Sequence, residues 1–229
     1  MKRLLSILFL LLVVVFAAAE TVLPRLVGDA VAQGMRAATG SNQVTAAVQK
    51  RPALLMLGGA FDKITVTALD AKIDKLTFRE LRAMLTDVQL DRDKLWARQA
   101  AIERVRDVEL TGTITQDELA RYLNQTVKGV RNAAVVITPG KMQVTTTYSL
   151  GGLASMVIAL EGKVASDGQR IKFVTERFFL NNMPVGGTSG SVLAEIPLLD
   201  LKKLPFGVIV RDIVMENGQV TISADNRPR

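Results

Sequence analysis

The chain has 229 residues, of which 48% are hydrophobic and 22% charged, a balance typical of a folded protein rather than a disordered one. Lysine and arginine outnumber aspartate and glutamate by 29 to 22, but the excess is spread along the chain, and tryptophan and tyrosine are scarce, so we expect no nucleic-acid partner. Cysteine and histidine are both absent. This excludes a thiol nucleophile, a disulfide framework, a lipid-modified cysteine, a Cys/His zinc site and a Ser-His-Asp triad.

The N-terminus has the pattern of a secretory signal. Lys2 and Arg3 precede an apolar run, residues 4–19, in which Ser6 is the only polar residue and which ends in three alanines. As a helix this run is about 24 Å long, shorter than the ~30 Å hydrocarbon core of a bilayer. We therefore expect residues 1–19 to be a cleaved signal peptide rather than a retained membrane anchor. In either case the rest of the chain is expected outside the cytoplasm, in the periplasm or cell envelope.

An amphipathic helix is expected next, within residues 20–40. Apolar residues recur at helical spacing along residues 24–38. Pro24 suits a first turn and Gly40 suits a stop. The apolar face is predicted to pack on the core, because the polar face lacks the lysines and arginines of a helix that lies on a membrane.

From residue 41 onward, apolar and polar residues alternate, which predicts antiparallel strands with one buried face. The alternating runs are residues 44–48, 64–68, 108–114, 142–150 and 154–164. The last of these would be about 36 Å long at ~3.3 Å per residue, so we expect an extended, curved sheet. Turns are predicted at Pro139-Gly140 and at Asn217-Gly218, the second inside a C-terminal hairpin of residues 206–215 and 219–223.

One helix interrupts the strands with a clear signal. Thr115 and Glu118 form a capping box, and Leu119, Tyr122 and Leu123 follow as an apolar face.

A similar pattern, Thr77 with Glu80, is followed too soon by alternation, so we interpret residues 76–81 as a turn leading into a strand. No linker or repeat divides the chain after this point. Residues 41–229 are therefore predicted to form one α+β domain, a long curved antiparallel sheet with two or three helices packed on it.

No motif for catalysis, metal binding or cofactor binding emerges. Ser189 lies in a glycine-rich loop, but the spacing of a nucleophile elbow fails and there is no histidine base. Asp91 and Asp93 alternate with basic residues, which favours a solvated turn over a calcium site. A hydrolase that uses serine, lysine or carboxylates stays the least favoured of the alternatives.

Three segments resemble a known family. They are "GGAFDKITVTALDA", "VELTGTITQDELARYLNQ" and "LKKLPFGVIVRDIVMENGQVTIS". In this order they are similar to the LmeA-like phospholipid-binding proteins of bacterial envelopes. The resemblance implies an elongated fold similar to tubular lipid-binding proteins, with acyl chains held in an apolar groove between a curved sheet and a helix. It implies no catalytic residue and no cofactor.

Exposing a chain of about fifteen methylenes to water would cost ~12 kcal/mol, so a soluble lipid carrier needs a long apolar concavity. The candidate lining residues are Leu119, Leu123, Met142, Tyr148, Met156 and Phe173, with Leu204 and Phe206 at the C-terminal hairpin. The same residues would also fill an ordinary closed core.

Two surface segments are candidates for membrane contact. Met183 and Val185 lie in a glycine-rich loop, and Lys202 and Lys203 can meet anionic head groups. The favoured function is thus an extracytoplasmic phospholipid-binding protein that carries or presents acyl chains for envelope lipid transport or homeostasis. The alternative is a non-catalytic envelope assembly module that docks on a protein partner.

Overall fold

A computed structural model of the chain describes residues 2–96, 101–127, 130–150, 154–181, 183–185 and 194–228. The side chains of residues 2–15, 17, 95–96, 148–150, 154–155, 194, 203 and 205 lie outside this description. The chain forms two compact units. The first consists of Met1–Ala68 and Arg82–Val108, and the second of Leu69–Leu81 and Glu109–Arg229.

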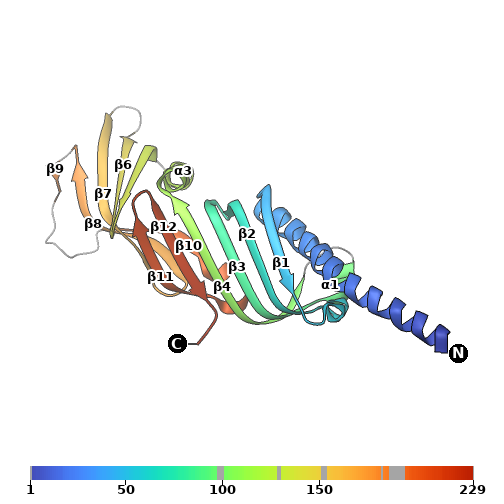
Figure 1. Ribbon diagram of the computed structural model, residues 1–229. Helices are drawn as coiled ribbons and strands as arrows, with labels where there is room; N and C mark the ends of the chain where they lie inside the picture. The colour runs from blue at the N-terminus through green and yellow to red at the C-terminus, as the bar shows by residue number, and fades with distance from the viewer. Residues whose placement is uncertain are drawn as a thin grey trace. The chain divides into compact units, whose positions relative to one another are not determined.

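Antiparallel strands with a few helices make up both units, which confirms the α+β class (Figure 1). The elements up to residue 126 are α1 (Lys2–Thr39), β1 (Gln43–Gln49), the 3-10 helix η1 (Ala53–Gly58), β2 (Ala60–Ile73), β3 (Leu76–Leu90), α2 (Arg92–Trp96), β4 (Ile102–Thr115) and α3 (Gln116–Thr126). The remaining elements are β5 (Val130–Thr138), β6 (Lys141–Leu150), β7 (Ala154–Ser166), β8 (Arg170–Leu180), β9 (Met183–Pro184), β10 (Ala194–Asp200), the 3-10 turns η2 (Leu201–Lys203) and η3 (Pro205–Gly207), β11 (Ile209–Glu216) and β12 (Gln219–Asp225).

The strands are divided between separate sheets, where the sequence predicted a single long one. One sheet has the order β1-β2-β3-β4-β12-β11, and another has the order β10-β8-β7-β6-β5 with β9 paired to β8. The chain leaves the first sheet at the end of β4, where α3 follows in place of a hairpin turn. It returns only with the C-terminal hairpin, whose β12 pairs with β4.

In the first unit, helix α1 packs on β1 and η1 (Figure 1). A Cβ at Gly28 would lie 2.9 Å from the carbonyl oxygen of Ala46, so this glycine permits the close approach of helix and strand. Val31 and Ala32 are buried on the same helix.

The expected position of Pro24 in a first turn is wrong, because Pro24 lies inside α1. The helix begins upstream, in a stretch rich in leucine and alanine, which are strong helix formers. Most side chains of residues 1–19 lie outside the described part of the structure, so their assignment as a signal peptide stays a prediction. Among the described residues, no helix is long and apolar enough to cross a membrane.

The capping box that we predicted for the second helix is confirmed. The hydroxyl of Thr115 accepts a hydrogen bond from the N–H of Glu118 at 3.3 Å, and α3 buries Leu119 and Leu123. The turns at Pro139-Gly140 and Asn217-Gly218 join β5 to β6 and β11 to β12.

Two local predictions are wrong. Residues 76–81 belong to strand β3 itself, because the turn occurs earlier, at residues 74–75. Phe206 is not part of the last hairpin: it lies in η3 with a positive φ of 73°, and β11 begins only at Ile209. Whether residues 41–229 fold as one domain stays a prediction.

The bend in β7 depends on Gly162. The register of β7 against β8 shifts between Glu161 and Gly162, and a Cβ at Gly162 would overlap the carbonyl oxygen of Val174. We expect Gly162→Ala to lower the free energy of unfolding by about 1–3 kcal/mol, because the neighbouring backbone must move. Urea unfolding measures this change. Gly58→Ala is the matched control, since a Cβ at Gly58 would meet no atom within 4 Å; equal effects of the two changes would contradict this account.

Candidate lipid-binding face

One face of the sheet formed by β5 to β8 is apolar, and we call it the inner face. In an antiparallel pair, residues opposite each other project to the same side. The register therefore places Met142, Gly162 and Thr175 on one side of the sheet, as it does Val164 with Phe173. The buried members of this face are Ala133, Val135, Ile137, Met142, Val144, Val164 and Phe173.

The C-terminal hairpin is held against this sheet at both of its ends. At the turn, the N–H of Gly218 donates to the carbonyl oxygen of Ile137 at 3.0 Å. At the open end, the N–H of Val210 donates to the carbonyl oxygen of Gly168 at 2.7 Å. Strand β11 contacts β5 and β7, and β12 contacts β5. The buried residues of the hairpin are Val210, Met215, Val220, Ile222 and Ala224.

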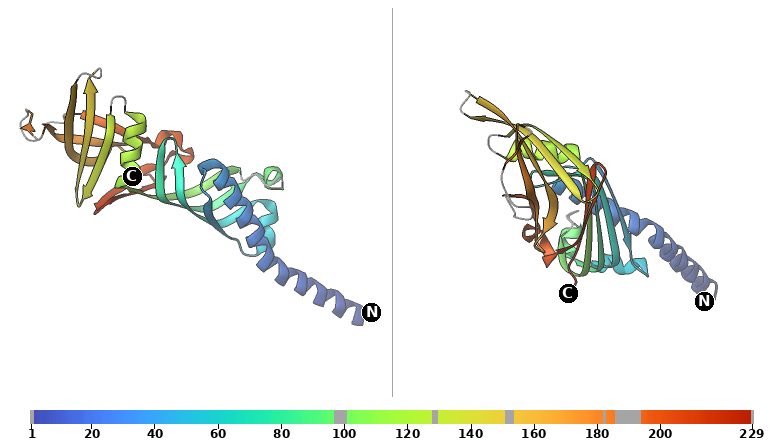
Figure 2. Two further views of the ribbon diagram at one scale, coloured as in Figure 1. Left: turned by 90° about the horizontal axis from the view of Figure 1, so that it is seen from above. Right: turned by 90° about the vertical axis from the view of Figure 1, so that its left-hand side faces the viewer.

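Helix α3 joins both edge strands of the same sheet. On β5, Asn124 Oδ1 accepts a hydrogen bond from the N–H of Ala133 at 2.9 Å, and Asn124 Nδ2 donates to the carbonyl oxygen of Ala133 at 3.5 Å. On β10, the hydroxyl of Tyr122 donates to the carbonyl oxygen of Pro197 at 3.0 Å. The helix lies beside β5 (Figure 2). It therefore bonds to both edge strands, and it buries Leu119 and Leu123.

Toward the β8–β9 turn, the inner face is only half-buried. Five apolar side chains there form what we call the apolar stripe: Met156, Ile158, Leu160, Phe178 and Leu180. The register pairs Ile158 with Leu180 and Leu160 with Phe178, so these four lie side by side. The stripe continues the buried part of the inner face into a region where large apolar side chains reach solvent.

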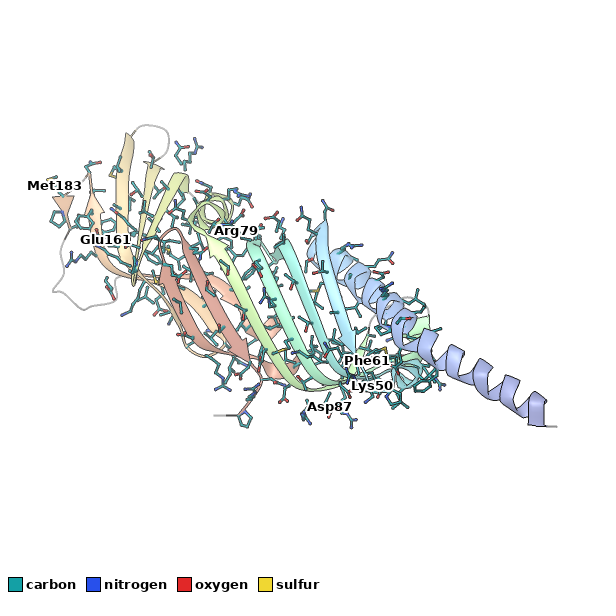
Figure 3. All side chains as sticks on the ribbon, in the orientation of Figure 1. Lys50, Phe61, Arg79, Asp87, Glu161 and Met183 are labelled. Atoms are coloured by element: carbon teal, nitrogen blue, oxygen red, sulfur yellow. The ribbon has the colours of Figure 1, made fainter. Side chains whose placement is uncertain are left out.

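A charged belt marks the other side of the sheet next to the stripe. Lys141 Nζ lies 2.8 Å from Glu161 Oε2, and Arg177 Nη1 lies 3.8 Å from the same oxygen (Figure 3 labels Glu161). Beyond this belt no charged residue occurs in residues 142–160 or 178–194. Because a charge is costly to remove from water, these charge-free stretches of β6, β7 and β8 suit apolar surroundings. Strand β5 differs, since its Arg131 pairs with Thr147 at this end of the sheet.

Thr175 places a buried hydroxyl on the inner face. Its side chain is fully buried, and its Oγ1 has no hydrogen-bond partner among the described residues. Thr146 on the same face differs, because its Oγ1 donates to the carbonyl oxygen of Arg131 at 3.0 Å. A buried hydroxyl without a partner costs about 1–3 kcal/mol, so Thr175 is the polar group of this face that is able to bind a ligand oxygen.

Several of the predicted lining residues lie on the inner face or on helix α3. Leu119, Leu123, Met142 and Phe173 are buried, with exposed fractions of 1–3%, and they contact protein rather than solvent. Met156 is half-buried in the stripe. Tyr148 pairs with Met156 in register, but its side chain lies outside the described residues.

The predicted contact residues at the C-terminal hairpin lie elsewhere. The segment that holds them is fixed at Leu201, whose N–H donates to the carbonyl oxygen of Gln169 in the β7–β8 turn. Leu204 and Phe206, both half-buried, and the exposed Lys202 follow in this region; the side chain of Lys203 lies outside the description. Met183 (Figure 3) and Val185 are exposed beside the opposite end of β8, where Met183 pairs with Leu180 and the N–H of Val185 donates to the carbonyl oxygen of Phe178.

The two predicted membrane contacts therefore do not form one surface. Strand β8 has 11 residues, which corresponds to about 36 Å at ~3.3 Å per residue. Met183 lies beyond one end of this strand and Lys202 lies near the other.

Sequence reasoning did not select Ile158, Leu160, Phe178 or Leu180 as site residues. The alternation of residues 154–164 contained the first two. Strand β8 was missed because its alternation is broken: the register shift beside Gly162 leaves Glu176 without a partner between Thr175 and Arg177. The charge-free stretch of residues 178–194 was the available signal.

The described residues offer little for metal chemistry. They contain no group of three or more carboxylates, histidines or cysteines that could hold a metal ion. Asp91 caps the short helix α2, because its Oδ1 accepts the N–H groups of Asp93 and Lys94 at 3.0 and 3.1 Å. These hydrogen bonds, that from Lys94 first, lower the pKa of Asp91.

The family model for LmeA-like phospholipid-binding proteins matches residues 18–225. The chain belongs to this family. The resemblance that the three sequence segments predicted is confirmed. Phospholipid binding is therefore the activity to which we relate the apolar inner face. No curated protein and no solved structure matches the chain.

The two threonines of the inner face give a direct test of this geometry. In the lipid-free protein, Thr175→Val should raise the free energy of unfolding by about 1 kcal/mol, because it removes an unsatisfied hydroxyl without changing the shape. Thr146→Val should lower it by a similar amount, since it leaves the carbonyl of Arg131 without its donor. Urea unfolding of delipidated protein measures both. A loss of stability in Thr175→Val would show that its hydroxyl has a partner.

Proposed function

We propose that this protein is an extracytoplasmic phospholipid-binding protein without enzymatic activity, which holds acyl chains along the inner face and serves lipid transport or homeostasis in the cell envelope. The observation that carries this proposal is the half-buried apolar stripe, which continues the buried interior in a member of a phospholipid-binding family. The proposal includes the tubular mode of lipid binding that the sequence resemblance implies.

The stripe is the proposed point of access. The acyl chain enters between the stripe and the elements that cover the inner face, because the side chains nearer to Gly162 are fully buried. Each methylene that leaves water contributes about 0.8 kcal/mol, so a long chain gains enough to separate packed side chains. The hydroxyl of Thr175 is available to donate to an ester carbonyl of the lipid.

The exposed residues Met183 and Val185, beside the end of β8, are the proposed contact with the donor or acceptor membrane. Met183 and Val185 expose 67% and 44% of their area. Residues 178–194, to which both belong, contain no charge. A surface of this kind can enter the interfacial region of a bilayer without desolvating an ionic group.

Native mass spectrometry of protein that is extracted from cells under mild conditions tests the proposal. We expect a bound phospholipid, and consistently lipid-free protein would argue for the alternative of an assembly module. The double variant Ile158→Gln with Leu180→Gln should retain about ten-fold less lipid, because two apolar contacts are lost.

A matched control uses apolar side chains that are exposed on other strands. Val136 on β5 and Val214 on β11 expose 51% and 42% of their area. The double variant Val136→Gln with Val214→Gln should keep its lipid. If both double variants lose lipid equally, the stripe is not the site.

A further inference from the structure

The 3-10 helix η1 of the first unit exposes three leucines on one surface. Leu54, Leu55 and Leu57 expose 37%, 51% and 38% of their area, whereas Ala53 and Met56 are buried. A 3-10 helix has three residues per turn, so positions 53 and 56 point inward together, whereas positions 54 and 57 share a second direction and position 55 takes a third, and all three leucines are exposed. No charged residue occurs in residues 52–61. We call these three side chains the leucine platform.

Hydrogen bonds hold the platform firmly at both ends. At its start, the N–H of Ala53 donates to Glu20 Oε1 at 2.7 Å. At its end, the N–H of Leu90 donates to the carbonyl oxygen of Gly59 at 2.7 Å, and Gln89 Nε2 donates to that of Gly58 at 3.0 Å. The leucines are thus displayed by a braced segment of backbone.

Gly59 is part of this bracing. It has a positive φ of 80°, and a Cβ there would lie 2.5 Å from the carbonyl oxygen of Leu90. Only glycine combines this conformation with so close an approach.

The exposed cation of Arg51 lies directly before the platform. Lys50 Nζ lies 2.7 Å from Asp62 Oδ1, and this hydrogen bond holds the pKa of Asp62 below its usual range. The carboxylate of Glu20 is engaged by the backbone N–H of Ala53. Arg51 is exposed at the start of the platform, and its guanidinium forms no ion pair among the described residues. A rigid apolar surface with a cation at its border complements an anionic lipid surface.

In the alternative in which residues 1–19 are retained as a membrane anchor, the position of the platform on helix α1 agrees with this partner. Glu20, which binds the backbone of η1, is the residue directly after the apolar run of residues 4–19. The platform therefore lies beside α1 at the level where that run ends.

We propose that Leu54, Leu55 and Leu57 enter the interfacial region of an anionic phospholipid bilayer, with Arg51 among the head groups. This inference rests on the proposed function in that both take phospholipid as the partner, but it concerns the first unit and does not require an acyl chain in the second.

A single fluorescent label tests the contact locally. The chain contains no cysteine, so Leu55→Cys in the full chain carries one NBD group. On addition of vesicles of phosphatidylcholine with phosphatidylglycerol, the emission of this label should rise severalfold and shift to the blue. Adding Arg51→Gln should lower the vesicle affinity by about five-fold.

Two labelled controls keep the readout specific. Val136→Cys carries the label at a position as exposed as Leu55, at 51%. Thr45→Cys places it on β1, in the same unit as the platform. A label at Leu55 that responds no more than either control would overturn the proposal, as would a response to protein concentration without vesicles, which indicates a second copy of the chain.

Native mass spectrometry of the same labelled protein separates this inference from the proposed function. Bound lipid together with a silent Leu55 label would overturn the inference and leave the function intact. A responsive Leu55 label in protein that never carries lipid would support the inference and count against the function.

Discussion

Two backbone hydrogen bonds, one at each end of the C-terminal hairpin, govern the interior of the second unit. Gly218 bonds to Ile137 at the turn and Val210 bonds to Gly168 at the open end. They hold the hairpin against the inner face, and α3 covers the same interior by joining both edge strands. Because the two bonds of the hairpin join main-chain groups only, they leave the side chains of the hairpin free to be apolar. The candidate lipid-binding face depends on this arrangement.

The same arrangement explains where the face stays incomplete. The hairpin and α3 bury the part of the inner face around Gly162, while the stripe from Met156 to Leu180 is only half-buried. The charged belt around Glu161 lies on the other side of the sheet, and residues 142–160 and 178–194 beyond it carry no charge. An apolar surface that is partly open and free of ionic groups favours a ligand whose chains are apolar.

The first unit follows the same principle with different elements. The 3-10 helix η1 is fixed by the hydrogen bond from the N–H of Ala53 to the Glu20 carboxylate and by that from the N–H of Leu90 to the carbonyl oxygen of Gly59. Three leucines stay exposed there although Ala53 and Met56 are buried beside them. Large apolar side chains on a braced segment indicate an apolar partner. Both units thus present apolar surface where ionic groups are absent, and both features fit a phospholipid-binding protein.

Local signals in the sequence determined the alternating strands, the turns at Gly140 and Gly218, the cap of α3 at Thr115 and the family, because each depends on neighbouring residues. Only the tertiary structure decided that the strands form separate sheets and that Met142 and Phe173 lie on the same face of one of them. Strand pairing joins residues that are distant in the sequence, and a single bulge moves every side chain after it to the other face. The separation of Met183 from Lys202 and the exposure of the η1 leucines also required it. A sequence shows which side chains are apolar, but burial depends on which elements cover them.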